Sequence, residues 1–308
     1  MSIDRLQQAI IAMKNPTVVG LDPTPQYIPE HILAEAKLKH GESLEALAEA
    51  FTIFNYGLID ALHDIVPAVK PQSAYYEAIG PAGVFVLQKT CAYAKEKGMY
   101  VIVDGKRNDI GSTAEAYSRA YLGEITFGAS TFSPFSADSL TVNAYLGEDG
   151  IQPFIKDCKA HDKSIFALVK TSNPSSGQLQ DLICGDRNLY TAVGDLLARI
   201  AQDTVGEYGY SCVGAVVGAT YPAEAARLRK RLSETFFLVP GYGAQGGKAS
   251  DVAASFDELG RGAVVNSARQ IICAWQTSPE GNGLDYKEAA RAKALAMKAD
   301  LAQFITIC

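Results

Sequence analysis

One short segment, VIVDGKRNDIGST (101–113), sets acids and bases directly after an apolar run. Asp104, Lys106 and Asp109 lie within six residues of one another. Carboxylates around a lysine hold it protonated, because opposite charge favours the charged form. A surface salt-bridge cluster is the ordinary explanation for such a run. The place of these residues after a strand that should be buried favours a proton donor in a polar site instead.

A second lysine, Lys70, ends the preceding apolar run, AVKP. If the two runs are neighbouring strands, the array Lys70–Asp104–Lys106–Asp109 alternates in sign. Such an array keeps an ammonium ready to give a proton. It also presents an acid that repels a carboxylate on the substrate.

Other polar residues follow other predicted strands. Asp22 follows the first, Ser172 the fifth, the segment PGYGAQGG (240–247) the seventh, and Arg269 the eighth. Glycines let a backbone approach an anion closely, and arginine makes bidentate contacts with phosphate. A flexible turn beside an exposed arginine is the plain alternative. The position of both features after the last two strands favours a phosphate site.

The elements that must position these residues are short β-branched or apolar runs separated by segments of helical periodicity. The eight runs span 17–22, 65–71, 99–104, 139–143, 164–170, 211–218, 235–240 and 262–266. Continuous apolar strands that alternate with helices predict a parallel sheet covered on both faces. A doubly wound sheet is the rival, but it would want a glycine fingerprint after its first strand, where Pro23 follows Asp22.

We therefore expect an α/β protein with a closed (β/α)8 TIM barrel, as one catalytic domain over 1–308. Its extended βα loops would be 23–42 and 171–188, and a helix over 286–304 would pack outside. Active sites of such barrels lie at the carboxyl ends of the strands, so all the polar residues above would meet at one mouth.

Composition limits the partners. The 308 residues carry a net charge of −6 without a basic stripe, which argues against nucleic acid. We expect no secretory leader and no membrane span, because apolar runs are short and charges interrupt the first segment. The six cysteines and four histidines lack metal-ligand spacing, and no cofactor motif occurs. We expect a cytoplasmic enzyme with neither metal nor cofactor.

Several motifs occur in the order found in one enzyme family: VVGLDPTP, AVKPQ, DGKRNDIGST, TVNAYLG, VKTSNPS, VPGYGAQGG and NSARQI. Over nearly its whole length the chain resembles orotidine 5′-phosphate decarboxylases, in particular the longer bacterial-type subgroup. The pattern D-x-K-x-x-D-I is the strongest single motif, although related barrels also carry D-x-K-x-x-D. The resemblance implies conversion of orotidine 5′-phosphate to UMP and CO2 in de novo pyrimidine biosynthesis, by a homodimer with shared active sites.

The resemblance also implies the catalytic roles. Asp104 would lie beside the substrate carboxylate, and Lys106 would protonate C6. Lys70 would contact the ribose and Asp104. Asp109 would reach into the partner subunit's site, where Thr113 would also touch the ribose.

The binding roles follow in the same way from the resemblance. Asp22 would hold a ribose hydroxyl, and Ser172 would hydrogen-bond the pyrimidine ring. Pro240 would line the pocket. Gln245 and Arg269 would bind the phosphate.

Two rival functions stay open at this point. A Mg²⁺-dependent sugar-phosphate lyase or aldolase on the same scaffold would want a glutamate near the end of strand two, where Lys70 repels a cation. An inert phosphate-binding or regulatory protein would be expected to lose Lys106 or one of its flanking acids, and the chain keeps them all.

Overall fold

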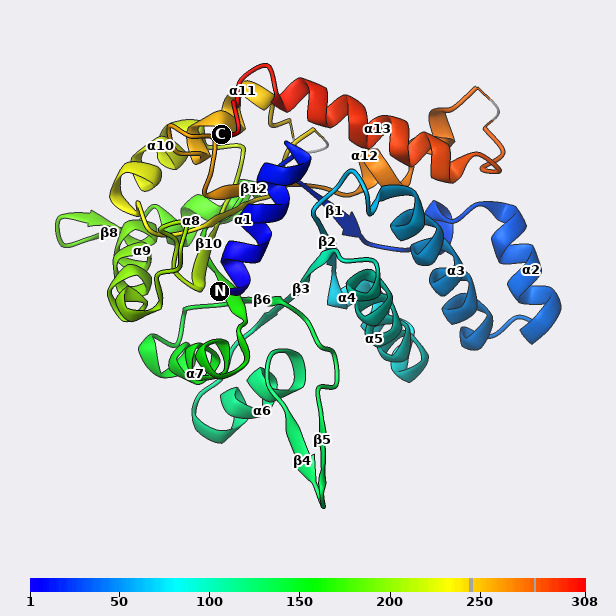
Figure 1. Ribbon diagram of the computed structural model, residues 1–308, viewed down its shortest axis with the longest axis horizontal. Coiled ribbons are helices and arrows are strands. Elements are labelled where there is room, and N and C mark those ends of the chain that lie inside the picture. The colour runs from blue at the N-terminus through cyan, green and yellow to red at the C-terminus, as the bar shows by residue number, and fades with distance from the viewer. Residues whose placement is uncertain (244–245, 280) are drawn as a thin grey trace.

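The computed structural model describes residues 1–243, 246–279 and 281–308. Eight parallel strands form a closed barrel in the order β1-β12-β11-β10-β7-β6-β3-β2 (Figure 1). They are β1 (Thr17–Leu21), β2 (Ala68–Pro71), β3 (Tyr100–Arg107), β6 (Ser139–Val142), β7 (Ser164–Lys170), β10 (Val213–Val217), β11 (Phe237–Val239) and β12 (Ala263–Ser267). The predicted (β/α)8 barrel is confirmed.

Each predicted strand is present, because apolar side chains fill both faces of the sheet. All five residues of β1 and all five of β10 are buried, as a parallel sheet with a filled interior and an outer helical layer requires. The register sets Gly20 of β1 opposite Lys70 of β2. It thereby brings the end of strand two to the barrel mouth.

Strand β3 runs three residues beyond the expected end at Asp104. Its ladder with β6 shifts register between Val103 and Arg107 and resumes where Arg107 pairs with Val142. Lys106 lies within this irregular stretch and has a positive φ of 48°. The part of the charged segment up to Arg107, which includes Asp104 and Lys106, is therefore held in the sheet and does not lie in a free loop.

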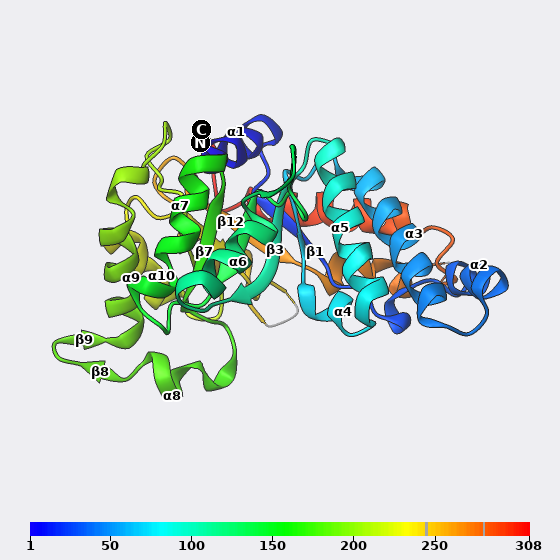
Figure 2. The same ribbon diagram turned by 90° about the horizontal axis from the view of Figure 1, so that it is seen from below.

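Helices cover the outside of the barrel (Figure 2). They are α1 (Ser2–Met13), α2 (Glu30–His40), α3 (Leu44–Leu62), α4 (Ser73–Glu77), α5 (Gly80–Glu96), α6 (Gly111–Tyr121), α7 (Gln152–His161), α8 (Gly177–Gln180), α9 (Leu189–Ile200), α10 (Pro222–Arg231), α11 (Ala249–Val252), α12 (Arg269–Ile272) and α13 (Tyr286–Leu301). The expected C-terminal helix packs outside, against α3. None of the helices described here has the length and apolar content needed to cross a membrane.

The two long loops contain structure of their own. Residues 23–42 hold a 3-10 turn (Pro25–Tyr27) and α2. Residues 171–188 hold a 3-10 turn (Pro174–Ser176), α8 and a two-stranded hairpin, β8 (Ile183–Cys184) and β9 (Arg187–Asn188). A second hairpin, β4 (Ile125–Phe127) and β5 (Ser130–Phe132), projects from the barrel in Figure 1.

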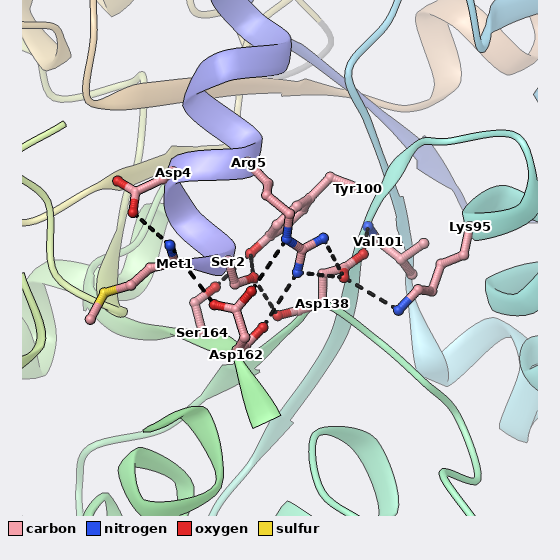
Figure 3. A network of polar contacts seen from close by, with 10 residues as sticks. All are labelled: Met1, Ser2, Asp4, Arg5, Lys95, Tyr100, Val101, Asp138, Asp162 and Ser164. Carbon is pink, nitrogen blue, oxygen red and sulfur yellow. Dashed lines mark hydrogen bonds and ion pairs between the residues drawn. The ribbon is translucent and has the colours of Figure 1, made fainter. Parts of the chain in front are cut away.

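The amino ends of the strands are closed by α1. Asp138, just before β6, accepts from the Val101 amide at 3.0 Å and lies 3.3 Å from Arg5 and 3.4 Å from Lys95 (Figure 3). The Tyr100 hydroxyl also bonds to Ser2 and Ser164, which draws α1 and two strand beginnings together. With this end sealed by structural contacts, the opposite end is the one left for a ligand.

Candidate active site

A cavity of about 510 Å³ opens at the carboxyl ends of the barrel strands. Six of the ten predicted site residues line it: Asp22, Lys70, Asp104, Lys106, Ser172 and Pro240. Leu168, Val216 and Leu238 provide an apolar floor. A larger hollow of about 670 Å³ lies against α12 and α13 and is lined by Gly243, Gly246 and Gly247 of the glycine-rich loop. Among the described residues, none of the ten predicted site residues lines it. The charged cavity is therefore the candidate site.

Asp104 is the centre of this cavity, and four side chains donate to its carboxylate. Lys70 Nζ and Gln72 Nε2 reach Oδ2 at 2.8 and 2.9 Å. Lys106 Nζ and Thr141 Oγ1 reach Oδ1 at 2.7 Å each. Both oxygens are thus held in place by neighbours from β2, β3 and β6.

The opposite charges of this cluster stabilise one another's ionised forms. Burial alone would raise the pKa of Asp104, but the ammonium groups of Lys70 and Lys106 outweigh it and hold the pKa well below its usual range. Burial likewise opposes the charge of Lys70, yet Asp104 and Asp22 raise its pKa above the ordinary value. The site therefore holds a fixed anion between two cations at neutral pH.

Lys106 combines a fixed backbone with a reachable side chain. Its amide donates to Thr141 Oγ1 at 2.9 Å, and its left-handed backbone turns the side chain back onto Asp104, two residues earlier. That conformation costs a non-glycine residue roughly 1–3 kcal/mol. The side chain is 46% exposed, in contrast to 6% for Lys70. Lys106 is thus the ammonium that a bound ligand can reach.

Asp22 and Asn266 face the same cavity from the ends of β1 and β12. The Oδ1 atom of each is buried and accepts no hydrogen bond from the described residues. Burial raises the pKa of Asp22, against the opposing effect of Lys70. Unfilled buried acceptors are costly, and both atoms suit hydroxyl donors on a ligand.

The glycine-rich loop and Arg269 border this side. Gly241, Gly243 and Gly246 have positive φ, which only glycine adopts without strain. A Cβ at Gly243 would lie 2.1 Å from the Gln270 side chain, so the loop passes tightly over α12. Arg269 begins α12, is exposed, and lies close enough for its charge to oppose the rise in the pKa of Asp22. The prediction for Gln245 lies outside the described residues.

Asp109 and Thr113 lie outside the cavity lining of their own chain. Asp109 Oδ1 accepts from the Ile110 amide at 2.8 Å, and Thr113 is exposed in the first turn of α6. Within the described chain the ion pair of Lys106 is with Asp104. The predicted four-member array thus has three members together in one chain, and the fourth, Asp109, lies outside the cavity lining.

Sequence reasoning assigned no role to several polar lining residues. Gln72 and Thr141 hold Asp104, Asn266 presents an unfilled acceptor, and Gln180 and Asn173 come from the long loop. Thr141 had a signal, because it is a polar residue between the apolar residues Leu140 and Val142 of a predicted strand. Gln180 had none, because it belongs to a loop whose path the sequence does not define.

Comparison with known proteins agrees with this geometry. The model of the orotidine 5′-phosphate decarboxylase / HUMPS family matches residues 19–278. The orotidine 5′-phosphate decarboxylase of Rhodopirellula baltica is 43% identical over 300 residues, covering 96% of this chain and 97% of that protein. That of Caldicellulosiruptor bescii is 42% identical over 273 residues, covering 89% and 90%.

Solved structures give the same answer. The crystal structure of a putative orotidine-monophosphate-decarboxylase from Toxoplasma gondii superposes with a TM-score of 0.76 at 29% identity, covering 98% of each chain. The family model spans most of the sequence, and the relatives share two fifths of their residues over almost their full length. The chain belongs to the orotidine 5′-phosphate decarboxylase / HUMPS family.

Proposed function

We propose that this protein is an orotidine 5′-phosphate decarboxylase, which converts orotidine 5′-phosphate to UMP and CO2 in pyrimidine biosynthesis. The observation that carries the proposal is the buried Asp104 carboxylate, held by Lys70 and by the more exposed Lys106. The names of the relatives support the same activity. The cytoplasm is the proposed compartment, since a reducing environment suits six unpaired cysteines.

The chemistry needs fixed charge at one point. Loss of CO2 from C6 leaves a vinyl carbanion with no attached electron sink, so stabilisation must come from a charge already in place. In the proposed mechanism the substrate carboxylate lies beside Asp104, whose oxygens already accept four hydrogen bonds and repel it. The Lys106 ammonium stabilises the developing carbanion and then gives its proton to C6.

The remote parts of the substrate hold the carboxylate in that position. The unfilled acceptors of Asp22 and Asn266 would receive ribose hydroxyls, and Ser172 would contact the pyrimidine ring. The glycine-rich loop and Arg269 would bind the phosphate. Binding energy from the phosphate can then be used to offset the repulsion at Asp104.

The rival functions fit the cavity less well. A sugar-phosphate lyase would use acidic groups as Mg²⁺ ligands, whereas Asp104 already accepts from two lysines, an amide and a hydroxyl. An inert binding protein would have no use for the left-handed backbone that presents Lys106. Neither rival is favoured by the relatives' names.

The direct test is the loss of orotidine 5′-phosphate absorbance on addition of purified protein in excess EDTA. We expect turnover to persist in the chelator, because the proposed mechanism uses side-chain charges alone. A Lys106→Ala protein purified in parallel is the control for a contaminating activity. Turnover that EDTA removes and Mg²⁺ restores would support the lyase instead.

We further propose a homodimer in which Asp109 acts in the partner's site, with Thr113 beside it. The support is that Asp109 lies three residues beyond Lys106 yet outside its own cavity, next to the exposed start of α6. A symmetric dimer would bring each such surface over the other subunit's mouth.

Subunit mixing tests this arrangement. Lys106→Ala and Asp109→Ala homodimers are expected to be nearly inactive alone. In a mixed dimer one site receives both wild-type groups, so random exchange of equal amounts should restore about a quarter of wild-type activity. Native mass measurement confirms the exchange. If mixed dimers form and no activity returns, Asp109 acts within its own chain.

A further inference from the structure

Lys170 is a buried lysine that the proposed mechanism does not use. It is the last residue of β7, its side chain is 1% exposed, and it is absent from the cavity lining. Its ammonium lies 4.4 Å from the ring centre of Tyr221 and 5.4 Å from that of Tyr190. It therefore sits between the barrel and the helical layer, in an aromatic setting that favours a cation.

The carboxylate that pairs with Lys170 comes from the long loop. Asp181 Oδ1 lies 2.6 Å from Lys170 Nζ, and Asp181 directly follows α8. Asn188 also donates to the Asp181 carbonyl at 3.0 Å, which ties the middle of the loop to its end. Figure 2 shows α8 and the β8–β9 hairpin at the edge of the molecule opposite both termini. The ion pair is thus a point where this protruding loop is attached to the barrel.

The residue before Asp181 faces the cavity. Gln180 Oε1 accepts from the Thr171 amide at 2.9 Å, and its Nε2 donates to Thr171 Oγ1 at 2.7 Å. Thr171, Ser172, Asn173 and Gln180 all line the cavity. The ion pair between residues 170 and 181 closes a ring around these residues, so it sets their distance from a bound ligand.

Gly177 leaves room for the Asp181 carboxylate. Its backbone has ordinary helical angles (φ −63°, ψ −24°), which alanine adopts without strain. A Cβ there would lie 2.8 Å from Asp181 Oδ2. A side chain at this position would therefore require the Asp181 carboxylate to move from the place where it meets Lys170.

Loss of Asp181 would leave the Lys170 ammonium buried without its acid. An uncompensated buried charge is strongly unfavourable, so the lysine would draw water or leave its site, and the loop would lose its attachment. We propose that Lys170 and Asp181 are a positioning pair that holds residues 171–181 against the cavity and thereby raises affinity for the pyrimidine nucleotide. Only the identity of that nucleotide rests on the proposed function.

The test compares Asp181→Ala with Asp186→Ala in the full-length protein. Asp186 belongs to the same loop, but its side chain is 94% exposed and lies 3.9 Å from Arg187, its one ion-pair partner among the described residues. We expect Asp181→Ala to raise both the Kd for UMP and KM about tenfold, equal to ~1.4 kcal/mol, with kcat changed less. The Thr171 amide should also exchange its hydrogen faster in the ligand-free protein. Asp186→Ala should change neither.

Three further variants sharpen the test. Asp181→Glu should recover part of the affinity, and Gly177→Ala should reproduce the loss although Asp181 is intact. Lys170→Met combined with Asp181→Ala leaves no unpaired buried charge, so it keeps the test valid if the single variant is unstable. It should show the same weakened UMP binding.

Equal UMP affinity and equal Thr171 exchange in Asp181→Ala and Asp186→Ala would overturn the proposal. A lower melting temperature with unchanged UMP affinity would also overturn it, since the pair would then be purely structural. If the wild type neither turns over orotidine 5′-phosphate nor binds UMP, the proposed function fails. Exchange at Thr171 would still decide whether the pair positions the loop.

Discussion

Two aspartates face the same cavity under opposite conditions. Asp104, within β3, accepts four hydrogen bonds and has its pKa held well below the usual range, chiefly by Lys70 and Lys106 acting against burial. Asp22, at the end of β1, has a buried oxygen without a donor, and burial raises its pKa. The hydrogen bonds of the Asp104 carboxylate are made before any ligand binds, whereas one oxygen of Asp22 still lacks a donor.

This difference separates two tasks within one mouth. A saturated carboxylate has nothing to offer a substrate except its charge, which suits a group that repels and orients. An unsaturated one gains a hydrogen bond when a hydroxyl arrives, which suits a group that binds. The strand-three side should therefore govern kcat, and the side formed by β1, β12 and Arg269 should govern KM.

The largest expected effect is on the strand-three side. Lys106→Ala should lower kcat by more than about 10⁴-fold, because proton donation (about 10²–10⁴-fold) and charge stabilisation (about 10²–10³-fold) are lost together. Binding of UMP, which lacks the carboxylate, should largely persist in calorimetry. Turnover within about tenfold of wild type, roughly 1.4 kcal/mol in barrier, would show that Lys106 is not the donor.

A smaller effect is expected on the opposite side. Arg269→Ala should raise KM strongly and lower kcat/KM. The corresponding loss of transition-state stabilisation should be ~1.5–3 kcal/mol, the size of a lost hydrogen bond to a charged group. Steady-state kinetics with Arg227→Ala as control would measure this, since Arg227 is exposed on α10 and pairs with Glu224.

Orotidine, which lacks the phosphate, makes the Arg269 test specific. If Arg269 binds the phosphate, its removal should hardly change the slow turnover of orotidine, because two changes in one interaction are not additive. An equal loss with both substrates would place the phosphate elsewhere and break the division between the two sides.

The sequence predicted the barrel and three members of the central cluster for a physical reason. Buried parallel strands need continuous apolar runs, and a charged residue directly after such a run has to emerge at the barrel mouth, as Lys70 and Asp104 do. The details that complete the site depend on tertiary contacts between distant segments. Gln72, just after β2, reaches Asp104 on the neighbouring strand β3. Gln180 bonds to Thr171 within a loop that the Lys170–Asp181 ion pair also holds.

The prediction that strand three ends at Asp104 was wrong for a similar reason, because pairing with a distant strand extends it to Arg107. The polarity of Lys106 and Arg107 suggested a loop, but the ladder resumes at Arg107 because β6 continues alongside it. The left-handed backbone of Lys106 had no signal either, since lysine is not a residue type associated with positive φ. Strain at a functional residue is set by the surrounding structure and not by local preference.

The smallest expected effect concerns stability, and it compares the two aspartates directly. Because the pKa of Asp22 is raised on folding, its ionisation costs more in the folded state than in the unfolded state. The free energy of unfolding is therefore reduced as pH rises from the ordinary value of 3.8 through the raised one, and it stays reduced at neutral pH. For Asp104 the sign is opposite, because its lowered pKa stabilises the fold above 3.8 and that stabilisation is lost as pH falls.

Asp22→Asn should accordingly stabilise the protein at pH 7 by on the order of 0.5–2 kcal/mol, typical of a single stabilising substitution, while lowering kcat/KM. The gain should shrink as pH falls, because the Asp22 carboxyl takes up its proton at a higher pH in the folded wild type than in the unfolded chain. Asp104→Asn should destabilise at pH 7, because it leaves buried Lys70 without its acid. Urea unfolding of the three proteins at pH 4, 5.5 and 7 measures these differences. If both substitutions shift the free energy of unfolding in the same direction at pH 7, the two carboxylates have the same effect on stability. The division of tasks between the two sides of the mouth then fails.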